Sequence, residues 1–183
     1  MPDYAFDRRW SDRFLPQIAQ IVGPLMLGAA PTYHDQRENT DLMVLDAHEN
    51  IRVAARVRKF GYFAGFGHDV TFRHARANGA ETEFAKLVNG FGRYFFYGHA
   101  NAEATDIPDW MVLDLNRFRG ALIKESLSHM PEPLRMKFVR QDNFDNETSF
   151  LAYDIRTFPK GIIVSMSASV TEILNRCPQY QVA

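Results

Sequence analysis

Two apolar runs joined by a short turn constrain the fold of this 183-residue chain more than any other feature. Residues 41–46 and 51–59 are rich in Val, Leu, Ile and Ala, and the segment AHEN between them suits a turn. Runs of this length, bounded by turn residues, are typical of paired β-strands. The sequence therefore predicts a β-hairpin that opens on Asp41 and carries Arg56 and Arg58 on its second strand.

Apolar side chains at spacings of three and four residues indicate the helices. Residues 11–27 contain one such stripe, and because Pro16 fits only a first helical turn, the helix should begin near residues 13–15 and end at Gly23 and Pro24. Shorter stripes predict further helices. These cover residues 81–91, 116–128 and 171–176.

Runs rich in aromatic and β-branched residues predict the remaining strands. Residues 28–39 suit a loop or a short edge strand, and the Gly-rich segment after residue 59 suits an irregular loop. Strands are expected over residues 70–74, 93–99, 109–115, 136–140, 149–155 and 161–166. This order predicts an α/β (α+β) domain with a mixed sheet flanked by helices, and a β-rich C-terminal elaboration over residues 117–183.

Composition indicates one folded domain over residues 1–183. The chain is 46% hydrophobic and contains 15 Phe, which is too apolar and aromatic for a disordered protein. Cys177 is the single cysteine, so we expect no intramolecular disulfide and a reducing cytoplasm as the setting. The apolar segment IVGPLMLGAAP is interrupted by glycine and proline and is shorter than the roughly 20 residues that span a bilayer, so no membrane anchor is expected.

Basic side chains gather after the turn of the hairpin, although the net charge of the chain is only −1. Residues 51–76 contain six cationic side chains and one acid, Asp69, which is a local excess of five positive charges. Such a run either attracts phosphate or forms a solvated face whose neutralising acids come from elsewhere in the fold. The six are Arg52, Arg56, Arg58, Lys59, Arg73 and Arg76.

The order of elements over residues 1–116 resembles the PD-(D/E)XK nuclease superfamily, also called restriction-endonuclease-like, whose core is a helix, a three-stranded meander, a helix and a strand. In that family an Asp begins the second core strand, and a Glu-x-Lys or Asp-x-Lys motif lies on the third. The acids hold Mg²⁺ while the Lys activates the attacking water. Asp41 matches the first position, so the resemblance implies a DNA-acting protein with Mg²⁺-dependent phosphodiester hydrolysis.

On the following strand, however, Arg56 and Arg58 stand where the acid and the lysine would be. An arginine cannot ligate a cation, and its high pKa makes it a poor proton shuttle. The hairpin alone therefore lacks the metal site that the resemblance implies.

One interpretation places the missing groups on the next helix, where Glu83 and Lys86 share a face at a spacing of three residues. Asp41, Glu83 and Glu38 would then bind Mg²⁺, with Lys86 near the water. Two simpler interpretations stay open: Glu83 and Lys86 belong to a solvated helix face, and Asp41 caps a loop.

A second interpretation is a nuclease-fold protein that does not cleave. The basic side chains would then bind the phosphates of a nucleic acid, or they would bind an acidic host protein that processes nucleic acids. These side chains are Arg52, Arg56, Arg58 and Lys59. The segments NTDLMVL, AARVR, ETEFAKL and RYFFYGHAN are similar to those of uncharacterised phage and prophage proteins, which implies a phage setting.

The remaining motifs predict no competing site. The six histidines lack His-x-x-x-His spacing and a cysteine cluster, so no structural zinc is expected. The segments GYFAGFG and GFGRYFFYG match neither a phosphate loop nor a dinucleotide turn, so we expect no glycine-rich loop that cradles a nucleotide. The run YFFY at residues 94–97 favours a strand buried on both faces over a base-stacking surface.

Overall fold

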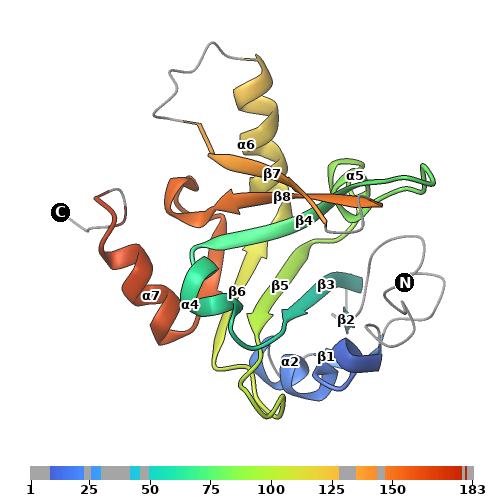
Figure 1. Cartoon of the computed structure of the whole chain (residues 1–183), viewed down its shortest axis with the longest axis vertical. Coiled ribbons are helices and arrows are strands. Elements are labelled where there is room, and N and C mark those ends of the chain that lie inside the picture. The colour runs from blue at the N-terminus through green and yellow to red at the C-terminus, as the bar shows by residue number, and fades with distance from the viewer. Residues whose placement is uncertain are drawn as a thin grey trace.

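The strands form two sheets that share one large core (Figure 1). The computed structural model describes residues 9–22, 26–29, 42–45, 50–127, 135–143, 147–178 and 180, with residues 26–29, 42–45 and 50 described by their backbone alone. The larger sheet has the order β1-β2-β3-β5-β6-β9 and mixes parallel with antiparallel pairs, and the smaller sheet has the order β4-β8-β7. This arrangement confirms the predicted α+β class with a mixed sheet flanked by helices.

The predicted hairpin lies within the larger sheet. Strands β2 (Leu42–Leu45) and β3 (Asn50–Arg58) pair antiparallel, with Leu42 opposite Val53. Strand β1 (Met26–Ala29) pairs antiparallel with β2 and completes a three-stranded meander. Most of the segment predicted as a loop or edge strand lies outside the described residues.

On its other side, β3 pairs in parallel with β5 (Tyr94–His99). Strands β6 (Asp109–Asp114) and β9 (Ile163–Met166) extend the sheet in antiparallel fashion. Phe96 and Tyr97 point to opposite faces of β5, and each is at most 1% exposed, so this strand is buried on both faces as predicted.

Parallel neighbours need a long crossover connection, and here the crossover contains a strand of the other sheet. It consists of α4 (Tyr62–Phe66), β4 (Asp69–Arg76) and α5 (Glu83–Val88). The segment expected to be an irregular loop contains the one-turn helix α4, because the Phe63 ring packs edge-on against the His99 ring at 5.2 Å. Strand β4 then leaves the larger sheet and pairs with β8.

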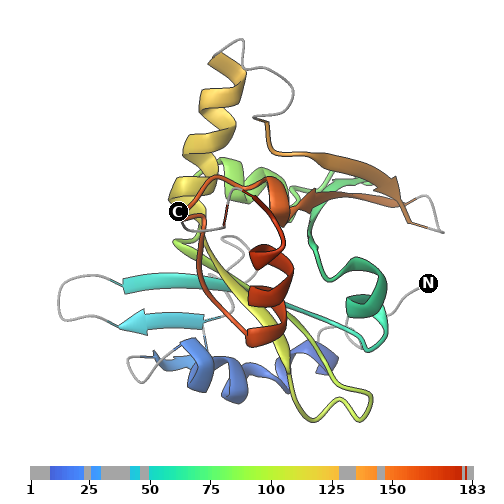
Figure 2. The same cartoon turned by 90° about the vertical axis from the view of Figure 1, so that its left-hand side faces the viewer.

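The C-terminal part of the chain completes both sheets. Strand β8 lies between β4 and β7 and pairs antiparallel with each, so the strands predicted over residues 136–140 and 149–155 form a hairpin. Helix α6 extends from the molecule at the end opposite α2, and α7 covers the flank that faces the viewer in Figure 2. The remaining elements are β7 (Phe138–Asp142), β8 (Thr148–Asp154), α6 (Leu115–Leu127), the 3-10 helix η2 (Ile155–Thr157) and α7 (Ala168–Asn175).

Side chains of β3 alternate between two cores. Val53 and Val57 pack in the core beside α2 (Leu15–Val22), the predicted first helix. Ala54 lies in the large aromatic core around Phe72, which both sheets share. Because residues two apart on a strand share a face, the arginines of β3 lie on the same side as Ala54, toward the second sheet.

Candidate functional site

Arg56 forms a largely buried ion pair with Glu83 of α5. Its Nη2 lies 2.7 Å from Glu83 Oε2, and the two side chains are only 19% and 9% exposed. Arg56 Nη1 also donates to the Thr71 carbonyl oxygen at 3.2 Å, and the backbone N–H of Arg73 donates to Glu83 Oε2 at 3.1 Å. The ion pair and its hydrogen bonds therefore connect β3 and α5 to strand β4.

Glu83 has this position because α5 begins there. Thr82 caps the helix: its hydroxyl accepts from the Ala85 N–H at 3.4 Å and donates to the His74 carbonyl oxygen at 3.0 Å. The cap anchors the first turn of α5 to β4. Glu83, the first residue of the helix, consequently reaches Arg56 rather than solvent.

The described residues do not assemble the magnesium site that the resemblance implies. Glu83 Oε2 already accepts two hydrogen bonds, and the guanidinium of Arg56 holds a fixed positive charge next to it, which repels a divalent cation. Nowhere in the described ranges do three His, Cys, Asp or Glu side chains gather as a metal ion would require. Asp41 and Glu38 lie outside the described residues, and Lys86 is half-buried on α5.

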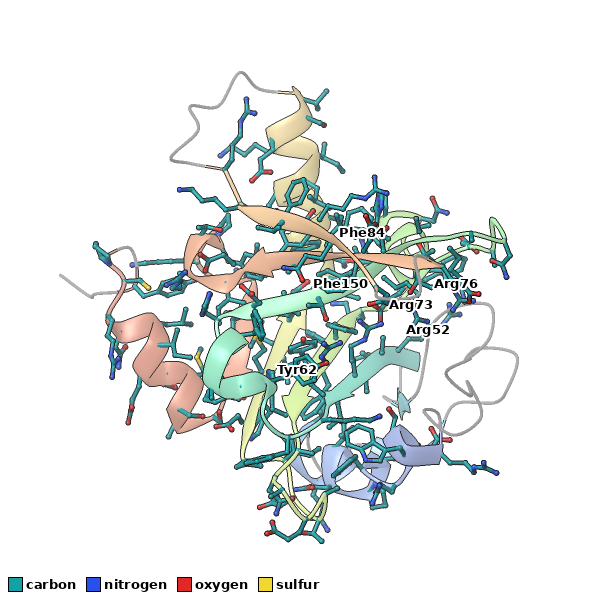
Figure 3. All side chains as sticks on the ribbon, in the orientation of Figure 1. Arg52, Tyr62, Arg73, Arg76, Phe84 and Phe150 are labelled. Carbon is teal, nitrogen blue, oxygen red and sulfur yellow. The ribbon has the colours of Figure 1, made fainter. Side chains whose placement is uncertain are left out.

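The other predicted cationic residues lie along the ends of β3 and β4. Arg52 is half-buried near one end of β3, and Figure 3 shows it on the same side of that view as Arg73 and Arg76 of β4. At the opposite end, Lys59 is exposed, with its ammonium 5.8 Å from the centre of the Trp10 ring. Cationic side chains therefore lie at both ends of β3, with Arg52 and Arg58 on the face toward the second sheet and Lys59 on the side of α2.

A chain of polar contacts runs from the ion pair toward a cavity. The Thr71 hydroxyl lies 3.4 Å from Arg56 Nη1 and 3.0 Å from the Tyr97 hydroxyl, and burial raises the pKa of Tyr97. We call Glu83, Arg56, Thr71 and Tyr97 the polar seam. At its far end, Thr71 and Tyr97 line the cavity, which has a volume of about 270 Å³.

Five strands and one helix contribute the walls of this cavity. Its polar lining includes Arg58 of β3 and His99 of β5. The Arg58 guanidinium lies over the Tyr62 ring of α4, 4.3 Å from its centre. Strands β7 and β8 complete the lining with Asp142 and Phe150, among others, while Asp69 and Thr71 come from β4.

His99 is a buried polar side chain without a partner. It is 2% exposed, and neither ring nitrogen finds a hydrogen-bond partner among the described residues. The rings of Phe63 and Tyr97 pack edge-on against it, with centroids at 5.2 and 5.4 Å. Burial, assisted by the charge of Arg58, lowers the pKa of His99 to about 4, so the ring is neutral near pH 7.

This pKa predicts a pH dependence of stability. An unfolded histidine takes up its proton near pH 6.5, whereas folded His99 resists protonation down to about pH 4. The unfolded state therefore binds more protons across that window, and the free energy of unfolding should fall as the pH is lowered through it. Urea unfolding across the window should show a steeper loss for the wild type than for His99→Asn, and equal slopes would contradict the prediction.

Sequence patterns identified only part of this site. The sequence predicts Arg56, Arg58 and Glu83 as functional residues but not Thr71 or Tyr97, and His99 is there one of six histidines without metal-binding spacing. A usable signal existed, because Tyr97 and His99 are two residues apart on a predicted strand and so share a face. The sequence does not show which strand or helix packs opposite Tyr97 and His99, so it does not predict the cavity between them and that element.

Comparison with protein-family models, with curated proteins and with solved structures gives no match to this chain. Across the described residues, no helix combines the length and apolar character needed to cross a bilayer. Any assignment of function consequently depends on the geometry of the polar seam, the cavity and the cationic side chains around them.

Proposed function

We propose that this chain is a phage-type, DNA-acting protein of nuclease-like fold that binds nucleic acid through its phosphates without cleaving it. The ion pair between Arg56 and Glu83 carries this proposal. The family's acidic position is an arginine, and the nearest carboxylate neutralises that arginine instead of a metal ion. The single cysteine, Cys177, is compatible with action in the cytoplasm.

The order of the elements supports a nuclease-like fold. Helix α2 precedes the meander β1-β2-β3, and α5 then precedes β5, which lies parallel to β3. This is the succession of helix, three-stranded meander, helix and strand that the PD-(D/E)XK resemblance implies. Strand β4, which the crossover sends to the other sheet, is an addition to that succession.

The distribution of charge supports phosphate binding. Of the acids near the basic segment, Glu83 is paired with Arg56, and Asp69 lies 3.6 Å from His68. Arg52 and Arg58 are six residues apart, or about 20 Å along an extended strand, which is the length of roughly six phosphates of a stacked nucleic-acid strand. A strand laid along β3 would therefore meet cationic side chains at both ends.

Binding of fluorescent single- and double-stranded oligonucleotides at several salt concentrations tests the proposal. Arg52→Ala combined with Lys59→Ala should weaken binding and make the dependence of log K on log salt shallower by about 1 to 2, because each lost phosphate contact contributes about 0.7 to 0.9. A matched control, Lys160→Ala with Arg176→Ala, removes two exposed cations beside η2 and α7 and should leave the slope unchanged. Equal losses in both double variants, or no binding by the wild type, would reject the proposal.

The same oligonucleotides distinguish binding from catalysis. Incubation with Mg²⁺ or Mn²⁺ should leave them intact. Cleavage that disappears in Asp41→Ala would instead support the metal-dependent reaction implied by the resemblance. A protein that neither binds nor cleaves nucleic acid would favour the alternative, an interaction with a host nucleic-acid-processing protein.

A further inference from the structure

We propose that the cavity beside the polar seam binds one unstacked nucleotide of the nucleic-acid strand, with its phosphate on Arg58 and its base between the aromatic side chains and His99. The inference rests on the proposed function and adds which part of the strand this surface recognises. No glycine-rich loop is needed for it, because side chains of β3, β5 and α4 supply the contacts.

The size of the cavity suits one nucleotide. Its volume of about 270 Å³ lies just below the roughly 300 to 1,000 Å³ of typical small-molecule sites. A cavity at the small end of that range suits one base with part of its sugar better than a stacked strand. A strand must therefore release one base from its stack to occupy it.

Aromatic side chains provide flat apolar walls for such a ring. Tyr62 and Phe66 of α4 are 43% and 50% exposed, so they lie where the cavity opens to solvent, and Phe150 contributes from β8. Tyr62 and Phe150 project from different elements, α4 and β8, in Figure 3. Stacking on aromatic rings is how proteins commonly hold unpaired bases.

Arg58 is placed to bind the phosphate of the same nucleotide. Its guanidinium is held against the Tyr62 ring, which leaves the planar edge of N–H groups available for a bidentate contact. Tyr62 would thus contact both the bound base and the arginine. One cation is enough for a phosphodiester, which carries a single negative charge.

The remaining polar groups favour a base over a larger anion. Neutral His99 offers one donor and one acceptor, and both are desolvated without a partner among the described residues, an arrangement that costs stability unless a ligand satisfies it. Asp69 and Asp142 also line the cavity. Their carboxylates would repel a polyphosphate, but they can accept hydrogen bonds from the exocyclic amino groups of adenine, cytosine or guanine.

Calorimetric titration of the full chain with dAMP, dCMP, dTMP, deoxyribose 5-phosphate and inorganic phosphate tests the inference. We expect dAMP and dCMP to bind more tightly than dTMP, which lacks an exocyclic amino group, and about tenfold or more tightly than sugar phosphate or inorganic phosphate. Arg58→Met should weaken dAMP binding by about tenfold, whereas Arg176→Met, at an exposed position after α7, should not change it. Thermal unfolding of each variant shows whether it is folded, and Tyr62→Ala, at a half-exposed position, provides a second variant expected to weaken dAMP.

The outcomes separate this inference from the proposed function. Inorganic phosphate binding as tightly as dAMP would overturn recognition of the base. Oligonucleotide binding that depends on Arg52 and Lys59, together with no binding of any mononucleotide, would overturn the cavity site and leave the proposed function standing. Mononucleotide binding without oligonucleotide binding would support the cavity as a nucleotide site and reject the proposed function.

Discussion

Arg56→Ala is expected to lower the free energy of unfolding by about 3 to 5 kcal/mol, the usual cost of removing one partner of a buried ion pair. The substitution leaves Glu83, whose side chain is 9% exposed, with a negative charge and only the Arg73 N–H as a hydrogen-bond donor among the described residues. It also removes a donor from the Thr71 carbonyl oxygen. Urea unfolding monitored by circular dichroism would measure the loss.

Two further variants show whether the loss of stability comes from the broken ion pair or merely from the shortened side chain. Arg56→Met combined with Glu83→Leu removes both charges, and should recover stability to within about 1 kcal/mol of the wild type, since apolar replacements of buried ion pairs are often neutral or stabilising. Arg140→Ala removes another strand arginine, which is 59% exposed and lies 3.9 Å from Asp142, and should cost about 0.5 kcal/mol or less. A double variant as unstable as Arg56→Ala alone would show that the charges are not the cause.

This pair bears on the proposed function, because Arg56 stands where the PD-(D/E)XK resemblance implies an acid of the metal site. A site that must capture Mg²⁺ keeps its carboxylates available, whereas Glu83 is committed to Arg56 and to the backbone of β4. Because Arg56 is paired with Glu83, the cation of β3 that lines the cavity is Arg58, which lies two residues further along the same face. The proposal of phosphate binding without hydrolysis follows from that division of roles between the two arginines.

Local pattern was sufficient to predict the hairpin and most of the helices. The hairpin followed from two runs of the right length around a short turn, and α2 followed from one apolar stripe with a proline in its first turn. These features are decided by residues close in sequence. Strand β4 was also anticipated, but its departure to the second sheet was not, since Val70 and Phe72 suit a buried strand in either sheet.

Contacts between distant segments explain what the sequence left open at the site. Arg56 and Glu83 were both predicted as functional residues, yet in separate roles, because their pairing depends on how α5 returns to β3. The same holds for helix α4, where the glycines of the segment indicated a loop. Packing of Phe63 against His99, a tertiary contact, stabilises a helical turn there instead.

Phe72→Ala is expected to reduce the free energy of unfolding by about 3 to 5 kcal/mol, as large-to-small changes of buried aromatic residues generally do. Phe72 of β4 is fully buried, and its ring centroid lies 5.1 Å from that of Phe95 on β5 and 6.0 Å from that of Tyr153 on β8. It also contacts the rings of Phe84 and Phe118, from α5 and α6. The side chain therefore joins both sheets and two helices.

Chemical denaturation of Phe72→Ala beside Phe72→Leu and Phe60→Ala gives the comparison. Phe72→Leu keeps most of the apolar volume and should lose less than Phe72→Ala, while Phe60, which is 67% exposed, should tolerate alanine within about 0.5 kcal/mol. A loss below about 1 kcal/mol for Phe72→Ala would mean that the two sheets are not held together by this core. Because the cavity is walled by strands of both sheets, its shape depends on the same contact, so a destabilised Phe72→Ala protein should also bind dAMP more weakly than Phe60→Ala.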